Sequence, residues 1–138
     1  MFAKEDEAET LEIVLTDRVS GLKAHLLYGV FPHLDVITRA VRLENTGTAP
    51  VTVKKAMSME MDYEYRELDA VHFYGRHIME RQMERTHLGH GNWSVGSIRG
   101  TSSHHHNPFV ILCDRNTEET YGDCYGYALA YLSLIHIS

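Results

Sequence analysis

The chain has 138 residues, of which 43% are hydrophobic and 23% charged, a composition typical of one globular domain with a packed core. Its net charge of -6 argues against the basic surface that binds phosphates, so no nucleic-acid partner is expected. No apolar run approaches the roughly 20 residues of a membrane helix, and the acidic start MFAKEDEAE lacks the apolar region of a signal peptide. We therefore expect a cytoplasmic protein with no membrane contact.

Alternation of apolar and polar residues begins near residue 11 and predicts a β-hairpin. Residues 11–16 alternate, residues 17–21 contain a Ser-Gly turn, and residues 22–30 alternate again. A period of two on both sides of such a turn is typical of antiparallel strands. Residues 35–44 and 51–61 are predicted to form a second pair across the Gly- and Pro-containing loop between them.

The rest of the chain continues the strand pattern. Shorter strands are predicted at residues 70–74, 76–83, 93–98, 110–113 and 121–131. No stretch sustains helical spacing, although residues 63–69 could hold a short turn. The sequence therefore predicts an all-β fold, an antiparallel β-sandwich in which the sheets pack face to face.

Two cations interrupt the apolar faces of the second predicted pair. Arg39 shares a face with Ile37, Val41 and Leu43, and Lys55 shares one with the valines and methionines of residues 51–61. A cation on a packed face must be paired, or a β-bulge must turn it outward. We expect these structural solutions rather than a ligand-binding role. For Arg39 we expect substantial burial beside a carboxylate or several carbonyl oxygens.

The last predicted strand is asymmetric, with tyrosines on one side and small residues on the other. Tyr125, Tyr127, Leu129 and Tyr131 alternate with cysteine, glycine and alanines. Aromatic stripes at strand spacing usually serve packing, so we expect the tyrosines to fill a core. A sugar-stacking platform that uses these tyrosines or Trp93 is the alternative.

The two cysteines, Cys113 and Cys124, lie inside apolar segments. Reducing compartments keep thiols free, and the acidic start of the sequence does not resemble an export signal. We therefore expect two reduced core thiols, with a disulfide as the weaker alternative.

The stretch RGTSSHHHNPF at residues 99–109 is the one candidate functional motif. Its polar members are Arg99, Ser102, Ser103, His104, His106 and Asn107, with His105 between the two outer histidines. A metal site, an acid/base cluster and a hydrogen-bonded structural loop are the three possible interpretations.

The structural interpretation is favoured on chemical grounds. In an extended segment His104 and His106 point one way and His105 the other, so the triplet supplies at most two ligands to one ion. No nucleophile elbow surrounds Ser102 and Ser103. We expect a structural loop in which Asn107 and the following proline turn the chain into the next strand, with no metal, no cofactor and no catalytic residue.

Six motifs in order resemble the N-terminal β-supersandwich domain of the glycoside hydrolase family 36 α-galactosidases. They are EDEAETLEI (5–13), LTDRVSGL (15–22), VITRAVRLENTG (36–47), GRHIMERQ (75–82), RGTSSHHHNPF (99–109) and GDCYGYALAY (122–131). The family typically shows RGASSHQHNPF and GEVYGFSLVYSGNF at the last two. Glutamine at position 105 in the family implies that the ring of His105 does no indispensable chemistry.

The resemblance implies that residues 1–131 are part of the N-terminal domain of a larger enzyme whose catalytic barrel is absent. The parent is expected to be a homo-oligomer that hydrolyses terminal α-linked galactose from melibiose- and raffinose-type oligosaccharides. The family's retaining mechanism uses two barrel aspartates, and none of that motif falls within residues 1–138. Residues 132–138, LSLIHIS, resemble one reading frame of a sequencing-library adapter, so we expect a non-native tail.

Two other functional classes remain open at this point. A stand-alone carbohydrate-binding β-sandwich would use the tyrosines or Trp93 to stack on sugar rings. A small metal protein would use the histidine triplet, and a metal titration would expose it.

Overall fold

The computed structural model describes residues 8–57, 59–64, 66–96 and 105–130. These residues form seven β-strands and no helix: β1 (Glu9–Thr16), β2 (Leu22–Phe31), β3 (Val36–Asn45), β4 (Leu68–Arg76), β5 (Met79–His87), β6 (His106–Asp114) and β7 (Cys124–Ala128). In the part of the chain so described, no helix is long and apolar enough to span a bilayer.

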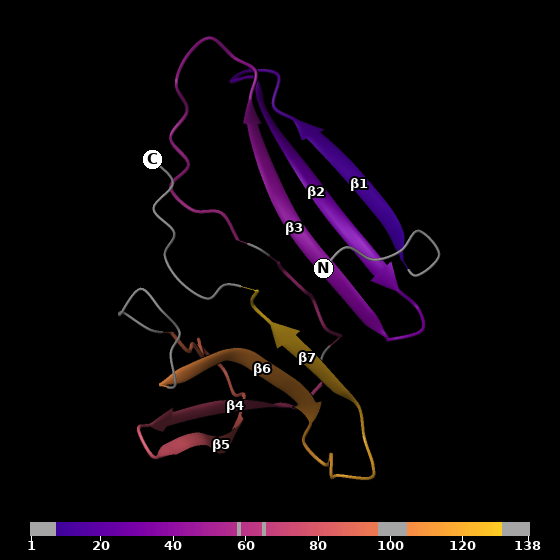
Figure 1. Cartoon of the computed structure of the whole chain (residues 1–138), viewed down its shortest axis with the longest axis vertical. Helices are drawn as coiled ribbons and strands as arrows, with labels where there is room; N and C mark the ends of the chain where they lie inside the picture. Colours follow the sequence, from indigo (N-terminus) through magenta and orange to yellow (C-terminus); the bar gives the residue numbers. More distant parts are fainter. Residues whose placement is uncertain (1–7, 58, 65, 97–104, 131–138) are drawn as a thin grey trace. The chain divides into compact units, whose positions relative to one another are not determined.

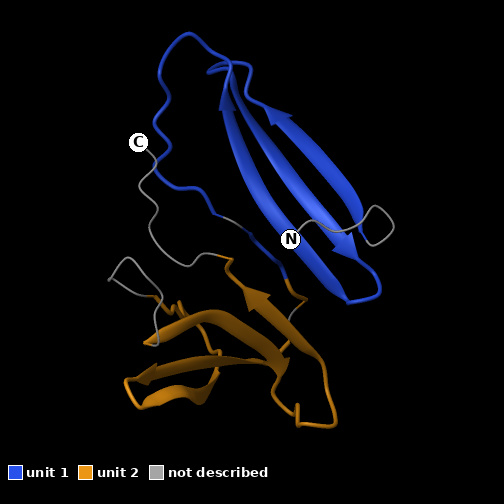
Figure 2. Cartoon of the chain, in the orientation of Figure 1, with its two compact units in different colours: residues 1–62 blue, residues 63–138 orange. Residues whose placement is uncertain are grey.

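The strands belong to two compact units, residues 1–62 and residues 63–138 (Figure 2). The first unit holds a three-stranded sheet in the order β1-β2-β3, and the second a four-stranded sheet in the order β5-β4-β6-β7 (Figure 1). Every strand pair is antiparallel. The predicted all-β, antiparallel class is thus confirmed.

The β1–β2 hairpin forms where alternation predicted it. A side chain of the turn accepts hydrogen bonds from the backbone amides of the same turn, which stabilises it. The Asp17 carboxylate accepts hydrogen bonds from the amides of Val19 (3.0 Å) and Ser20 (3.2 Å). Gly21 then adopts a φ of 75°, in the left-handed region that favours glycine. A Cβ at Gly21 would lie 2.7 Å from the backbone nitrogen of Gly47, so a side chain fits neither the conformation nor the space.

The partner of β3 differs from the prediction. β3 pairs along its whole length with β2, from Leu22 opposite Asn45 to Phe31 opposite Val36. The described residues between 51 and 61 form no strand, and Lys55 is exposed there. Alternation alone does not make a strand, because the backbone groups also need a neighbour to hydrogen-bond. The predicted strand at 51–61 is therefore wrong.

Arg39 lies on its predicted face with a different partner. It stands opposite Tyr28 on β2, and its guanidinium carbon lies 5.4 Å from the centroid of the tyrosine ring. The residue is half-buried, and no carboxylate pairs with it among the described residues. The expected ion pair is replaced by a cation–π contact, which an aromatic face provides without bringing a second charge into the sheet.

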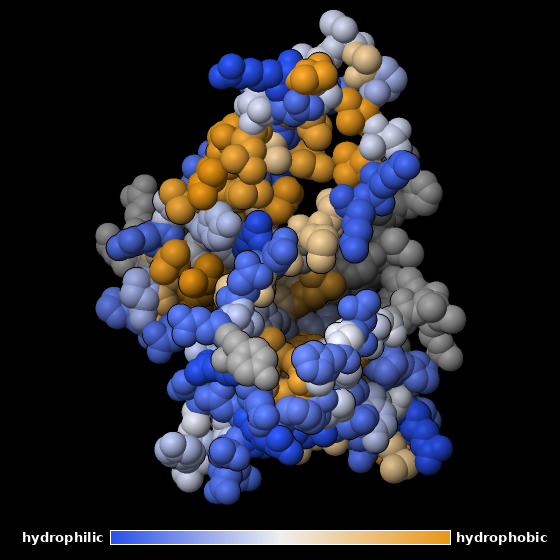
Figure 3. All heavy atoms as spheres, turned by 180° about the vertical axis from the view of Figure 1, so that it is seen from behind, coloured by the Kyte–Doolittle hydropathy of each residue, from blue (hydrophilic) through white to orange (hydrophobic). Residues whose placement is uncertain are grey.

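Apolar side chains of the first unit are widely exposed. Figure 3 shows them gathered over this part of the molecule. One face of the sheet contributes Leu11, Ile13, Leu15, Ile37 and Leu43, which are between 39% and 67% exposed.

The core of the second unit lies around β4, the inner strand between β5 and β6. Leu68, Ala70 and Val71 are buried there. The rings of Phe73 and Phe109 stack at 6.2 Å on the neighbouring strands β4 and β6. The same strand pair places Asp69 on β4 opposite Cys113 on β6.

The strand ends in this unit depart from the predicted bounds. β5 begins at Met79 rather than at residue 76, because the chain turns at residues 77–78, where Ile78 has a φ of 72°. β4 and β6 are longer than predicted and β7 is shorter. Residues 93–96 form no strand, and the remainder of that predicted element lies outside the described residues.

Candidate functional site

The histidine motif is described only at its C-terminal end. Arg99, Ser102, Ser103 and His104 lie outside the described residues. His106 and Asn107 are the first two residues of β6, with His106 opposite Tyr74.

The prediction that Asn107 and Pro108 form a turn before the strand is wrong, because both belong to β6. The β4–β6 register shifts between His72 and Tyr74, and such an irregularity accommodates a proline without an N–H. Pro108 still takes part in pairing, since its carbonyl accepts the amide of Leu129 at 2.8 Å.

The described end of the motif is held by the sheet. The carbonyl of His105 accepts a hydrogen bond from the amide of Gly75 at 3.3 Å. Nδ1 of His106 is buried and has no hydrogen-bond partner within the described part of the chain. Among residues 8–57, 59–64, 66–96 and 105–130, no cluster of three His, Cys, Asp or Glu side chains could hold a metal ion. Because His104 is outside these ranges, the expected absence of a metal stays a prediction.

The structure brings together a set of ionisable residues that the sequence did not reveal. His87, Asp69, Cys113 and Cys124 stand directly opposite one another on β5, β4, β6 and β7. Directly opposite residues of antiparallel strands project from the same face of the sheet. We call these four residues the four-strand row. The sequence does not predict this row, because it depends on the pairing registers of β4 with β5, β4 with β6 and β6 with β7.

Asp69 is the buried charge of the four-strand row. Its Oδ2 lies 2.6 Å from Nε of Arg85, and its Oδ1 lies 3.1 Å from Nδ1 of His87. Burial alone would raise the pKa of this carboxyl, but the hydrogen bonds from Arg85 and His87 more than offset it. The pKa of Asp69 therefore lies below its ordinary value.

Arg85 connects this carboxylate to the loop between β6 and β7. Its terminal nitrogens donate to the carbonyl oxygens of Thr117 (2.8 Å), Arg115 (2.7 Å) and Asp114 (3.1 Å). The hydrogen bond to Asp69 is the main reason that the pKa of Arg85 is raised. One guanidinium thus fixes two strands and the loop that follows a third.

Cys113 is not an activated catalytic nucleophile in this setting. The residue is 3% exposed, and its thiol donates a weak hydrogen bond to the carbonyl of Asp69 at 3.7 Å. Burial raises the pKa of the Cys113 thiol, so it is protonated at neutral pH. The imidazole of His87 is bonded to Asp69 rather than to the thiol. The four-strand row is therefore not a Cys-His-Asp catalytic arrangement.

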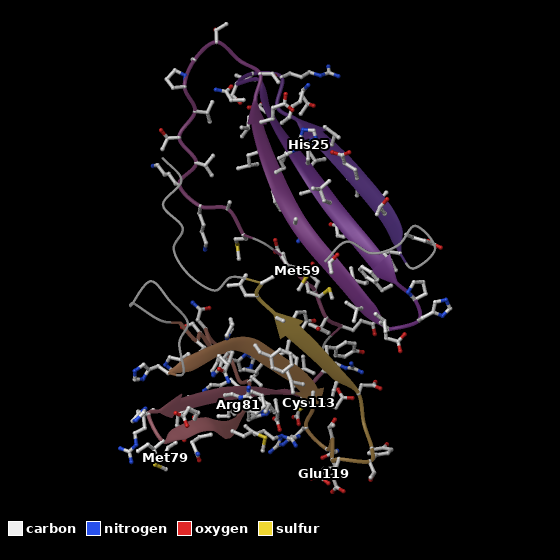
Figure 4. The ribbon with its side chains drawn as sticks, in the orientation of Figure 1. His25, Met59, Met79, Arg81, Cys113 and Glu119 are labelled. Carbon is white, nitrogen blue, oxygen red and sulfur yellow. The ribbon has the colours of Figure 1, made fainter. Side chains whose placement is uncertain are left out.

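A second ionic cluster lies in the first sheet, around the buried His25 (Figure 4). Its Nδ1 lies 2.7 Å from Oε1 of Glu12, and its Nε2 lies 3.1 Å from Oε2 of Glu44. Both carboxylates are engaged by one imidazole, and Arg42 approaches Glu12 at 3.4 Å. The cluster links all three strands of the sheet.

The second unit also has a hollow of about 630 Å³, lined by residues 87–93 together with Val110, Leu112 and Tyr127. Trp93 packs edge-on against His72 at 5.5 Å. Tyr125, outside the hollow, packs on Tyr63 at 5.4 Å. The described residues that line the hollow include no carboxylate, whereas retaining glycoside hydrolysis uses two.

Comparison with known proteins identifies the family to which this fold belongs. Residues 1–132 match the family model described as the glycosyl hydrolase family 36 N-terminal domain. The chain belongs to this family. The resemblance drawn from the six motifs is thereby confirmed.

Relatives of this family 36 domain are much longer than the chain. It is 53% identical over 131 residues to the bifunctional α-galactosidase/sucrose kinase AgaSK of Mediterraneibacter gnavus, covering 95% of the chain and 14% of that protein. It is 42% identical over 128 residues to the α-galactosidase Mel36A of Lactobacillus acidophilus, covering 93% of the chain and 18% of that protein. The chain thus spans less than a fifth of either relative.

Solved structures of family 36 enzymes have the same fold. The galactosidase domain of AgaSK matches with a TM-score of 0.90 at 52% identity, over 96% of the chain and 18% of that structure. The α-galactosidase AgaA of Geobacillus stearothermophilus matches with a TM-score of 0.91 at 39% identity, over the same shares. The predicted fold class, an antiparallel β-sandwich domain of this family, is confirmed.

Proposed function

We propose that the chain is the non-catalytic N-terminal part of an α-galactosidase that removes terminal α-linked galactose from raffinose-type oligosaccharides. The observation that carries the proposal is the family match over residues 1–132, together with relatives that are α-galactosidases. One structure of AgaA at 39% identity holds raffinose and another holds stachyose, which supports this substrate class.

The engagement of three carboxylates in the ionic clusters supports a structural role for these residues. Retaining hydrolysis needs two carboxylates about 5–5.5 Å apart, both free to face one glycosidic bond. Asp69 is held by Arg85 and His87, while Glu12 and Glu44 share His25. We therefore assign the chemistry to the part of the enzyme that follows in its relatives, and a structural role to this chain.

The two free thiols support placement in the cytoplasm, where reducing conditions keep cysteines unpaired. The exposed apolar side chains of the first sheet are typical of a domain that packs against further protein. We also propose that the full-length enzyme is a homo-oligomer.

A chimaera tests the proposal directly. Residues 1–131 would replace the matching segment of AgaSK, and hydrolysis of a chromogenic α-galactoside would be measured. We expect the chimaera to retain activity, whereas the isolated chain should show none above background. Turnover by the isolated chain, or an inactive but folded chimaera, would contradict the assignment. Light scattering of the active chimaera would report its oligomeric state.

A further inference from the structure

The two cysteines of the chain occupy opposite positions on neighbouring strands. Cys113 on β6 pairs with Cys124 on β7, at the end of the four-strand row. Both are free thiols (Figure 4 labels Cys113). The carbohydrate-degrading role proposed above makes no use of either thiol, so their placement needs its own explanation.

The backbone hydrogen bonds define the geometry of this pair. The amide of Asp114 bonds to the carbonyl of Asp123 at 3.3 Å, and the amide of Leu129 bonds to the carbonyl of Pro108 at 2.8 Å. Both bonds join directly opposite residues, and such pairs alternate with pairs that lack them. Cys113 and Cys124 are one step from the first pair and therefore occupy a non-hydrogen-bonded position.

At such positions the Cα atoms are about 4.5 Å apart and the side chains approach each other most closely. A disulfide accepts Cα separations of about 4.4–6.8 Å, so this pair lies at the short end of the allowed range. A bond formed by thiol–disulfide exchange is opened by the same exchange when a reduced thiol is in excess. The pair can therefore form a bond that a reductant reverses.

The loop between the two cysteines holds them in this register. Arg85 donates to the carbonyls of Asp114, Arg115 and Thr117. Within the loop, the amide of Thr117 bonds to the carbonyl of Asp114 at 2.9 Å. The register is therefore set before any bond between the sulfurs forms.

We propose that Cys113 and Cys124 form a reversible intramolecular disulfide when a small disulfide oxidant, such as oxidised glutathione, is present. The exposed thiolate of Cys124 attacks one sulfur of the oxidant and releases one glutathione thiolate. The thiolate of Cys113 then attacks the Cys124 sulfur and releases the second. The protein loses two protons and two electrons, and one oxidised glutathione becomes two reduced molecules.

The order of the two steps follows from exposure. Cys124 is exposed, whereas Cys113 is buried, gives up its contact with the Asp69 carbonyl and must lose its proton. Closure is therefore slower than the first attack. The product links the edge strand β7 to β6, which is its only strand neighbour in the described sheet.

The test is oxidation of the full chain with oxidised glutathione, followed by alkylation and thiol counting under denaturing conditions. We expect titratable thiols to fall from two to zero, with the intact mass lower by two hydrogens and no glutathionyl group retained. Trypsin cleaves after Arg99 and Arg115, so peptides 100–115 and 116–138 should appear joined until a reductant is added.

Two single variants separate the steps. In Cys113→Ala, Cys124 should retain one glutathionyl group, because no second thiol displaces it. In Cys124→Ala, the buried Cys113 should stay reduced in the folded chain. Circular dichroism would confirm that both variants are folded. Thiols that remain free in the wild type, a stable adduct on Cys124, or a disulfide between two chains would each overturn the proposal.

Discussion

Nε of Arg85 lies 2.6 Å from Oδ2 of Asp69, which is a buried residue. The same guanidinium donates to the carbonyls of Asp114, Arg115 and Thr117. One side chain on β5 thus pairs with a charge on β4 and also hydrogen-bonds to the segment that leads from β6 to β7. This relationship leads to the first two predictions.

Replacing Arg85 with methionine should lower the free energy of unfolding by about 2–3 kcal/mol, because a buried carboxylate loses its main donor. Partial exposure of Arg85, at 35%, keeps the expected loss below that of a fully buried pair. Urea denaturation of the full chain would measure it. Arg115→Met is the matched control, since its pair with Glu67 is exposed on both sides and should contribute less than about 1 kcal/mol. Equal losses in the two variants would contradict this account.

Stability should fall in acid because of Asp69. Its pKa in the folded chain lies below the ordinary value of 3.8, so its contribution is fully present above 3.8 and is lost as the pH falls through the folded value. Asp69→Asn should remove that part of the pH dependence. The measurement is the urea midpoint of both proteins from neutral pH to below 3.8. Parallel pH profiles would show that Asp69 does not carry the effect.

The Arg39–Tyr28 contact should depend on the aromatic face and not on the hydroxyl. Tyr28→Leu should lower the free energy of unfolding by about 0.5–1 kcal/mol beyond the change in packing, because the guanidinium loses the ring below it. Tyr28→Phe keeps the ring and should be nearly neutral. The additional variant Arg39→Met in both backgrounds completes a double-mutant cycle. A coupling energy of zero would show that the contact contributes nothing.

Gly21→Ala should destabilise the β1–β2 hairpin by about 1–2 kcal/mol from its positive φ alone, and by more from the contact with the Gly47 backbone. That neighbour is backbone, which cannot move aside cheaply. Gly89→Ala is the control, because a Cβ there meets nothing within 4 Å. Thermal midpoints of the two variants should therefore differ clearly, with Gly21→Ala the lower.

Much of the fold could be predicted wherever the deciding interaction is local. The hairpin of β1 and β2 follows from alternation and from an Asp-to-Gly turn that completes its own hydrogen bonds. The predicted strand at 51–61 has the same alternation but no pairing neighbour, and it does not form. Alternation predicts which side chains would share a face of the sheet. The neighbouring strand that hydrogen-bonds to the backbone N–H and C=O groups comes from elsewhere in the chain, and alternation does not predict it.

Of the candidate site, the sequence alone indicated little. The polar members of the histidine motif were visible by spacing, but only His106 and Asn107 fall in the described residues, and they begin a strand. The partner of Arg39 could not be predicted, because a tyrosine ring and a carboxylate satisfy the same requirement for burying a cation.

The sequence by itself determined the strand class, the first hairpin and, through its ordered motifs, the family. The tertiary structure alone decided that His87, Asp69, Cys113 and Cys124 share one row. These residues are far apart in the chain, and a shift of one residue in any of three strand pairings would move a member to the opposite face. Register is set by packing and turn geometry over the whole sheet, so no local pattern could have placed the two thiols side by side.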